Sequence, residues 1–151
     1  MPPASNRITP GRILIVDDND LGLVARKSVL AEFGHEIVTT SLPHHALEMC
    51  STQKFDLIVT DYKMPKMNGI EFIRQLRLVN KTVPVILLSG FTNTLGLSEE
   101  NTGASAVIQK SANEVAHLIR SVNQLLAKPV KKPARSQGGR AAQKTKGAAA
   151  E

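Results

Sequence analysis

Short aliphatic runs recur along the first 127 residues, and each is followed by a longer segment with helical spacing. Continuous apolar runs of this length are typical of buried parallel strands, whereas apolar residues three or four positions apart are typical of helices packed on a sheet. The alternation predicts an α/β fold, a doubly wound (βα)5 unit with a five-stranded parallel sheet and helices on both faces. The expected strands are residues 12–16, 36–40, 55–61, 83–88 and 104–108.

The first expected helix spans residues 21–33, and Asn19 or Asp20 can serve as its N-cap. Gly34 follows this helix and is a typical C-terminal stop. Helical spacing assigns five small or apolar residues to the inner face, namely Val24, Ala25, Ser28, Val29 and Ala31. We therefore expect this stripe to pack against the sheet.

Two later helices also carry local signals. Ser41 is the expected N-cap of the second helix, with Pro43 in its first turn. Residues 94–101 form a weaker helical segment, because they are largely polar and include Gly96. This low helix propensity predicts poor local stability for the segment.

Length and charge divide the chain into a folded part and a tail. With 151 residues and 42% hydrophobic content, the chain is long enough for one domain with an aliphatic core. Residues 1–127 carry 12 basic and 12 acidic side chains, whereas residues 128–151 carry seven basic side chains and one acidic one, which accounts for the whole net charge of +6. We predict a flexible lead over residues 1–10, a folded domain over residues 11–127 and a basic disordered tail beyond it.

The sequence carries no signal for secretion or for a membrane. Its first ten residues lack the apolar core of a signal peptide, and no run approaches about 18 apolar residues. Cys50 is the only cysteine, which excludes an internal disulfide, and the chain has no cysteine and histidine cluster of the kind that binds zinc. These features predict a soluble, cytoplasmic protein.

Four of the five expected strands end in a polar residue with reactive chemistry. Asp17 and Asp18 follow the first strand, and Asp61, Ser89 and Lys110 mark the ends of the third, fourth and fifth. The carboxyl ends of parallel strands share one edge of a sheet, where open α/β folds bind ligands. Three carboxylates crowded there repel one another unless a cation is present, and such oxygen ligands suit Mg²⁺ or Mn²⁺.

The same residues are complementary to a phosphoryl group. A divalent ion and the Lys110 ammonium can neutralise its equatorial oxygens, while the Ser89 hydroxyl donates to one of them. A carboxylate between them can attack phosphorus and form an acyl phosphate. The alternative is that each residue has a local role, with Asp17 and Asp18 beginning a loop and Asp61 capping a turn. The joint arrangement at four strand ends favours the chemical interpretation.

The motifs at these strand ends resemble those of the receiver domains of two-component response regulators, over residues 11–127. The motifs are ILIVDD at residues 13–18, DYKMPKMNG at 61–69, PVILLSG at 84–90, and GAS at 103–105 leading to Lys110. The resemblance implies a sheet in the order 2-1-3-4-5. It also implies a regulatory phosphoacceptor rather than an enzyme, in which Asp61 accepts a phosphoryl group from the phosphohistidine of a sensor histidine kinase or a histidine phosphotransfer protein.

The resemblance also implies a role for each site residue. The expected Mg²⁺ ligands are three carboxylates and one backbone carbonyl, those of Asp17, Asp18, Asp61 and Lys63. Ser89 and Lys110 would bind the phosphoryl group and transmit its arrival to surfaces that bind a downstream protein. Family analogy further allows either a monomer or a phosphorylation-dependent homodimer.

Several positions depart from the family's pattern or tune it. Ser111 follows Lys110 where the family usually has proline, so we expect the loop there, and with it the placement of Lys110, to differ. Val107 stands where the family has an aromatic switch residue, which predicts weaker coupling or coupling through another element. Lys63 and Phe91 occupy the positions that tune dephosphorylation, and neither can act as a general base for water, so we expect slow self-dephosphorylation.

Two alternatives to this function follow from the sequence. The seven positive charges of the tail can support weak, salt-sensitive nucleic-acid binding without sequence preference, as in a nucleic-acid-associated adaptor, although such tails are also common as solvated spacers. The departures at Ser111 and Val107 also suggest a degenerate receiver that no longer takes phosphate. The complete set of three acids argues against this second alternative.

Overall fold

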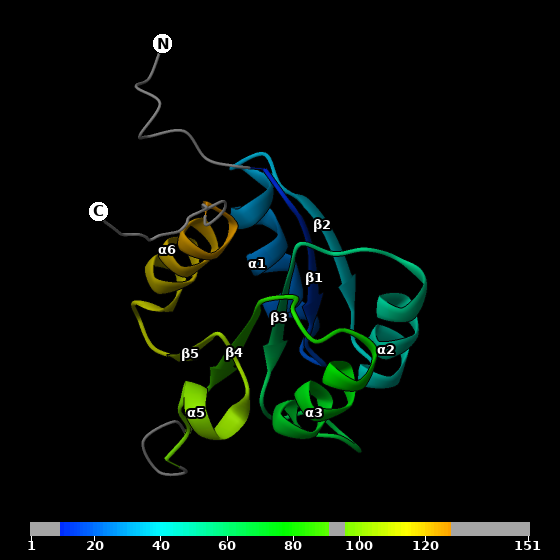
Figure 1. The fold of residues 1–151 in the computed structure, drawn as a ribbon. Coiled ribbons are helices and arrows are strands. Elements are labelled where there is room, and N and C mark those ends of the chain that lie inside the picture. The colour runs from blue at the N-terminus through cyan, green and yellow to red at the C-terminus, as the bar shows by residue number, and fades with distance from the viewer. Residues whose placement is uncertain (1–9, 91–95, 128–151) are drawn as a thin grey trace, which may run out of the picture.

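A computed structural model describes residues 10–90 and 96–127, and Figure 1 shows the α/β arrangement that the sequence predicts. Five parallel strands form one sheet in the order β2-β1-β3-β4-β5, which confirms the predicted fold class and strand order. The strands are β1 (Arg12–Val16), β2 (Glu36–Thr40), β3 (Leu57–Asp61), β4 (Val85–Ser89) and β5 (Ala106–Gln109). The helices are α1 (Asp20–Ala31), α2 (Pro43–Thr52), α3 (Gly69–Val79), α5 (Glu99–Thr102) and α6 (Glu114–Ala127).

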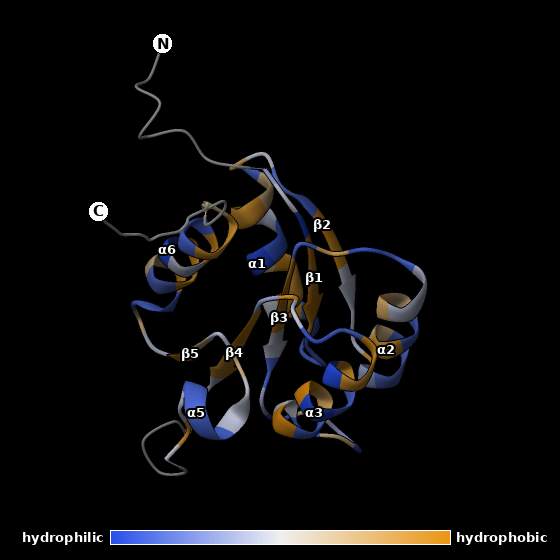
Figure 2. Ribbon diagram, viewed as in Figure 1, coloured by the Kyte–Doolittle hydropathy of each residue, from blue (hydrophilic) through white to orange (hydrophobic). Residues whose placement is uncertain are grey.

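Successive residues along each strand pack on opposite faces of the sheet, so two cores form. One core joins strand residues to apolar residues of α1 and α6, among them Ile15, Val59, Leu30 and Leu118. The other joins the intervening strand residues to α2 and α3, among them Leu14, Ile58, Ala46 and Phe72. Figure 1 shows these helix pairs on opposite sides of the sheet, and in Figure 2 the central strands are coloured mainly as hydrophobic.

The strand register brings the carboxyl ends of the strands to one edge. Asp61 of β3 pairs with Leu88 of β4, and Ser89 of β4 pairs with Gln109 of β5. The residues that leave β1, β3, β4 and β5 therefore meet at the same edge, as the parallel arrangement requires.

The inner face of α1 differs from the predicted one. Leu23, Arg26 and Leu30 are the buried residues of α1, whereas Val24 of the predicted inner stripe is 66% exposed. The predicted inner face was wrong because the buried face of α1 includes a charged residue, Arg26, which a search for apolar residues misses. Arg26 is nevertheless only 8% exposed, so it requires partners inside the fold.

Two helices begin at other residues than predicted. Leu42, not Ser41, occupies the N-cap position of α2, and its backbone N–H donates to the Thr40 hydroxyl at 3.3 Å. In the described part of the weak helix predicted over residues 94–101, residues 96–98 are not helical, and α5 begins after Ser98, whose side chain caps it. Gly96 itself has a φ of 66°, in the left-handed region that ends helical geometry.

Some of the predicted segments lie outside the described residues. These are residues 128–151, the predicted basic tail, and residues 1–9 of the predicted N-terminal lead. Within the described residues, no helix has both the length and the hydrophobicity needed to cross a membrane.

Candidate functional site

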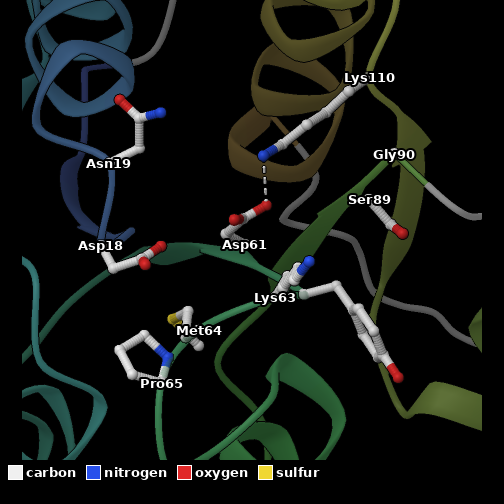
Figure 3. Close-up of a pocket in the computed structure, with 10 residues that line it drawn as sticks. Asp18, Asn19, Asp61, Lys63, Met64, Pro65, Ser89, Gly90 and Lys110 are labelled. Atoms are coloured by element: carbon white, nitrogen blue, oxygen red, sulfur yellow. Dashed lines mark ion pairs between the residues drawn. The ribbon is translucent and has the colours of Figure 1, made fainter.

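A cavity of about 630 Å³ opens at the carboxyl edge of the sheet (Figure 3). The residues that line it include five that the sequence singled out, namely Asp18, Asp61, Lys63, Ser89 and Lys110. They come from the ends of β1, β3, β4 and β5, which lie far apart in the sequence. The sheet topology therefore assembles the polar strand ends in one place.

Three carboxylates gather at this edge of the sheet, two of which line the cavity. Each of Asp17, Asp18 and Asp61 offers an oxygen, and these atoms all lie within 4.8 Å of one another. Mg²⁺ prefers oxygen ligands at about 2.0–2.1 Å and keeps several waters, so this donor set fits a divalent ion after small side-chain adjustments. Asp17 and Asp61 are 1% and 5% exposed, and like charges buried this close are costly without a cation.

Lys110 supplies a positive charge to the cavity. Its Nζ lies 2.6 Å from Oδ1 of Asp61, and Figure 3 shows the ammonium pointing at that carboxylate. Burial raises the pKa of the Asp61 carboxyl above its ordinary value, and the hydrogen bond and charge of Lys110 oppose this shift. The Lys110 ammonium thus reaches the site although Ser111, not proline, follows it.

The backbone around Asp61 is held by the start of α3. Asn68 caps this helix by accepting a hydrogen bond from the Glu71 N–H at 2.9 Å, and the Gly69 N–H donates to the Tyr62 carbonyl at 2.7 Å. A Cβ at position 69 would lie 2.6 Å from the carbonyl oxygen of Asp61, closer than such contacts occur. Glycine is therefore required for α3 to begin against the end of β3.

Arg26 is the site-adjacent residue that sequence reasoning missed. Its guanidinium forms an ion pair with Asp17, and its Nη2 lies 2.8 Å from Oε2 of Glu114 at the start of α6. The only signal in the sequence is its position, three residues after Leu23 and four before Leu30, on the buried face of α1. A charged residue in an apolar stripe predicts buried partners, and Asp17 and Glu114 are those partners.

The other residues that the sequence singled out differ in their position relative to the cavity. Ser89 is buried and lines the cavity, but in Figure 3 its hydroxyl is directed away from Asp61. Lys63 also lines the cavity, whereas Phe91 lies outside the described residues. Val107 lies in β5, where its side chain is partly buried against one of the cores.

Comparison with known families decides the identity of this fold and site. The family model of the response regulator receiver domain matches residues 13–123. The chain belongs to the response regulator receiver domain family. Receiver domains of this family are regulatory phosphoacceptors of two-component systems and are phosphorylated by sensor histidine kinases.

Individual relatives agree with this assignment of the receiver domain. The chain is 36% identical over 90 residues to the alkaline phosphatase synthesis transcriptional regulatory protein PhoP of Bacillus subtilis, and the match covers 57% of this chain and 38% of that protein. The structure of the Francisella response regulator 1452 receiver domain is similar, with a TM-score of 0.69 and 29% identity over 77% of this chain and 96% of that one. Response regulator TrrA of Thermotoga maritima, solved in complex with Mg²⁺-BeF, has a TM-score of 0.64 and 28% identity, over 74% of this chain and 97% of that one.

Proposed function

We propose that this receiver domain is the phosphoacceptor of a two-component phosphorelay. In this proposal an oxygen of Asp61 attacks the phosphorus of a phosphohistidine carried by a sensor histidine kinase or a histidine phosphotransfer protein. A P–O bond to Asp61 forms as the P–N bond of the donor breaks, and the imidazole, which carries a proton on its other ring nitrogen, leaves as neutral histidine. The observation that carries the proposal is the placement of Asp61 in the cavity, with two acids and the Lys110 ammonium around its carboxylate.

The carboxylate cluster supports a divalent cation as cofactor, Mg²⁺ or Mn²⁺. The proposed ligands are the carboxylates of Asp17, Asp18 and Asp61 and the backbone carbonyl of Lys63. When bound, the ion neutralises charge on the transferring phosphoryl group. The TrrA structure in complex with Mg²⁺-BeF, a relative with 28% identity, supports this part of the proposal.

Ser89 and Lys110 are the proposed phosphoryl-binding residues. Lys110 already faces Asp61 and would exchange part of that ion pair for a phosphoryl oxygen. The Ser89 hydroxyl has to turn toward Asp61 before it can donate to the phosphoryl group, because it is directed away in Figure 3. Such a rotation, together with the shift of Lys110, would carry the phosphorylation state to the surface that binds a downstream protein.

Intact mass measurement tests the phosphoacceptor. The protein is incubated with a small phosphodonor and Mg²⁺, and a species heavier by about 80 Da, the mass of one phosphoryl group in such transfer, is expected in the wild type. Asp61→Asn should abolish it. Asp56→Asn is the matched control, since Asp56 lies just before the opposite end of β3 and should leave the transfer intact. Phosphorylation of Asp61→Asn at the wild-type level would reject Asp61 as the acceptor.

Slow self-dephosphorylation is the second part of the proposal. Lys63 lines the cavity and offers no general base that could activate water at neutral pH. We therefore expect the phosphorylated protein to persist far longer than seconds after the donor is removed. Lys63→Glu should shorten the half-life, because a carboxylate can accept a proton from water. Decay within seconds in the wild type, followed by intact mass, would contradict this expectation.

A further inference from the structure

Arg26 links the acidic cluster to α6. It is 8% exposed and lies between two carboxylates, that of Asp17 in the cluster and that of Glu114 in the first turn of α6. Its Nε also donates to Oε2 of Glu114 at 2.9 Å, so the guanidinium binds Glu114 through two nitrogens. Such paired, buried contacts fix a guanidinium in one orientation.

Both oxygens of Asp17 are already engaged by the protein. Oδ1 accepts a hydrogen bond from the Asn19 N–H at 2.9 Å, and Oδ2 accepts one from Arg26. Helix α1 also makes room for this pair. A Cβ at Gly22 would lie 2.9 Å from Nη1 of Arg26 and 3.1 Å from Oδ2 of Asp17, so the glycine leaves the space that the ion pair fills.

We propose that Arg26 is a positioning residue that competes with the divalent cation for Asp17, and that Glu114 sets the strength of this competition. The inference rests on the proposed metal site. A cation at the cluster and the guanidinium share one carboxylate, so they repel each other and each weakens the other's hold on Asp17. Glu114 offers Arg26 a second carboxylate and thereby draws it away from Asp17.

The arrangement couples metal occupancy to α6. A cation bound beside Asp17 shifts the balance of Arg26 toward Glu114, which tightens the contact between α1 and α6. Linkage is reciprocal, so a change at Glu114 alters the affinity for the cation by the same free energy. Removal of the guanidinium should therefore raise this affinity, and removal of the Glu114 charge should lower it.

Magnesium titration measures both effects directly. Tyr62 lines the cavity and is the only tyrosine in a chain without tryptophan, so its fluorescence reports on this site alone. We expect Arg26→Met to bind Mg²⁺ about tenfold more tightly and Glu114→Gln about fivefold more weakly, in keeping with usual coupling strengths. In Arg26→Met the second substitution, Glu114→Gln, should have no further effect, because Glu114 acts through Arg26. Isothermal titration calorimetry gives an independent reading.

The ion pair of Arg12 and Glu36 provides matched controls, because these residues begin β1 and β2 at the end of the sheet opposite the cluster. Arg12→Met and Glu36→Gln change the same charges there and should leave the Mg²⁺ affinity unchanged. Equal Mg²⁺ affinity in wild type, Arg26→Met and Glu114→Gln would overturn the inference, while phosphorylation of Asp61 would still support the proposed function. An effect of Glu114→Gln that persists without Arg26 would also overturn it. If Arg26→Met does not fold, an unchanged Mg²⁺ affinity in Glu114→Gln overturns the inference about Arg26. A wild type that binds no Mg²⁺ and takes no phosphoryl group overturns both this inference and the proposed function.

Discussion

His35 is a buried histidine whose protonation should destabilise the fold. It is 6% exposed, and its Nδ1 accepts a hydrogen bond from the Gly11 N–H at 3.1 Å, which requires an unprotonated nitrogen. Burial lowers the pKa of His35 below the ordinary value of 6.5. The unfolded chain therefore binds the proton more readily, and the stability that His35 contributes is complete above pH 6.5 and declines as the pH falls below it.

The pH dependence of the variant His35→Asn tests this prediction. Asparagine can accept the Gly11 hydrogen bond but does not titrate, so we expect its unfolding free energy to change less than that of the wild type between pH 7.5 and pH 5.5. Urea unfolding at the two pH values gives the difference. His44→Asn is the control, since His44 lies exposed on α2. Identical pH dependence of wild type and His35→Asn would contradict the prediction.

Arg26 marks the limit of sequence reasoning at the residue scale. Sequence reasoning could predict the positions of the three acids and of the lysine at the carboxyl edge of the sheet, Asp17, Asp18, Asp61 and Lys110. Each ends or follows a recognisable strand, and parallel strands end together. Arg26 stands inside a helix, and its role depends on which face of α1 is buried. That face is set by packing against α6, a segment about ninety residues later, so no local pattern reveals it.

The first turn of α3 positions Asp61, the proposed phosphoacceptor. In Gly69→Ala the new Cβ would meet both the Asp61 carbonyl and the Leu87 side chain at 2.6 Å, so α3 or the end of β3 has to move. We expect a loss of about 1–3 kcal/mol in unfolding free energy, the usual range for overpacking, and slower phosphorylation of Asp61. Asn68→Ala is the comparison, because it removes only the helix cap, at about 1 kcal/mol. Urea unfolding and the rate of mass increase separate the two variants, and wild-type phosphorylation by Gly69→Ala would contradict the prediction.

At the scale of elements, strands were predicted better than helix starts. Runs of aliphatic and β-branched residues identified all five strands, and the three central ones, β1, β3 and β4, are buried on both faces nearly throughout. Helix starts depend on which nearby oxygen receives the first free N–H. The Thr40 hydroxyl accepts the Leu42 N–H, which moves the start of α2 past Ser41. Which acceptor is used depends on the folded geometry, so the sequence alone does not predict the first residue of the helix.

At the scale of the whole molecule, residues 1–127 and residues 128–151 differ in charge. Residues 10–90 and 96–127 contain the sheet, the helices and the acidic cavity, and residues 1–127 as a whole are balanced in charge. Residues 128–151 carry seven basic side chains and one acidic one. We therefore expect phosphorylation to need nothing from residues 128–151, and any attraction to nucleic acid to depend on them.

Deletion of residues 128–151 tests this separation. The full chain should bind double-stranded DNA weakly and without sequence preference, with a dependence of log affinity on log salt no steeper than about −6 if all seven charges contact phosphates. The chain that ends at Ala127 should lose this binding but keep its urea midpoint, because Leu118 and Val122 of α6 still fill the core. It should also keep phosphorylation of Asp61. Replacement of the seven basic residues by glutamine is the control for tail length. DNA binding that survives both changes would mean that the folded domain, not the tail, contacts the DNA phosphates.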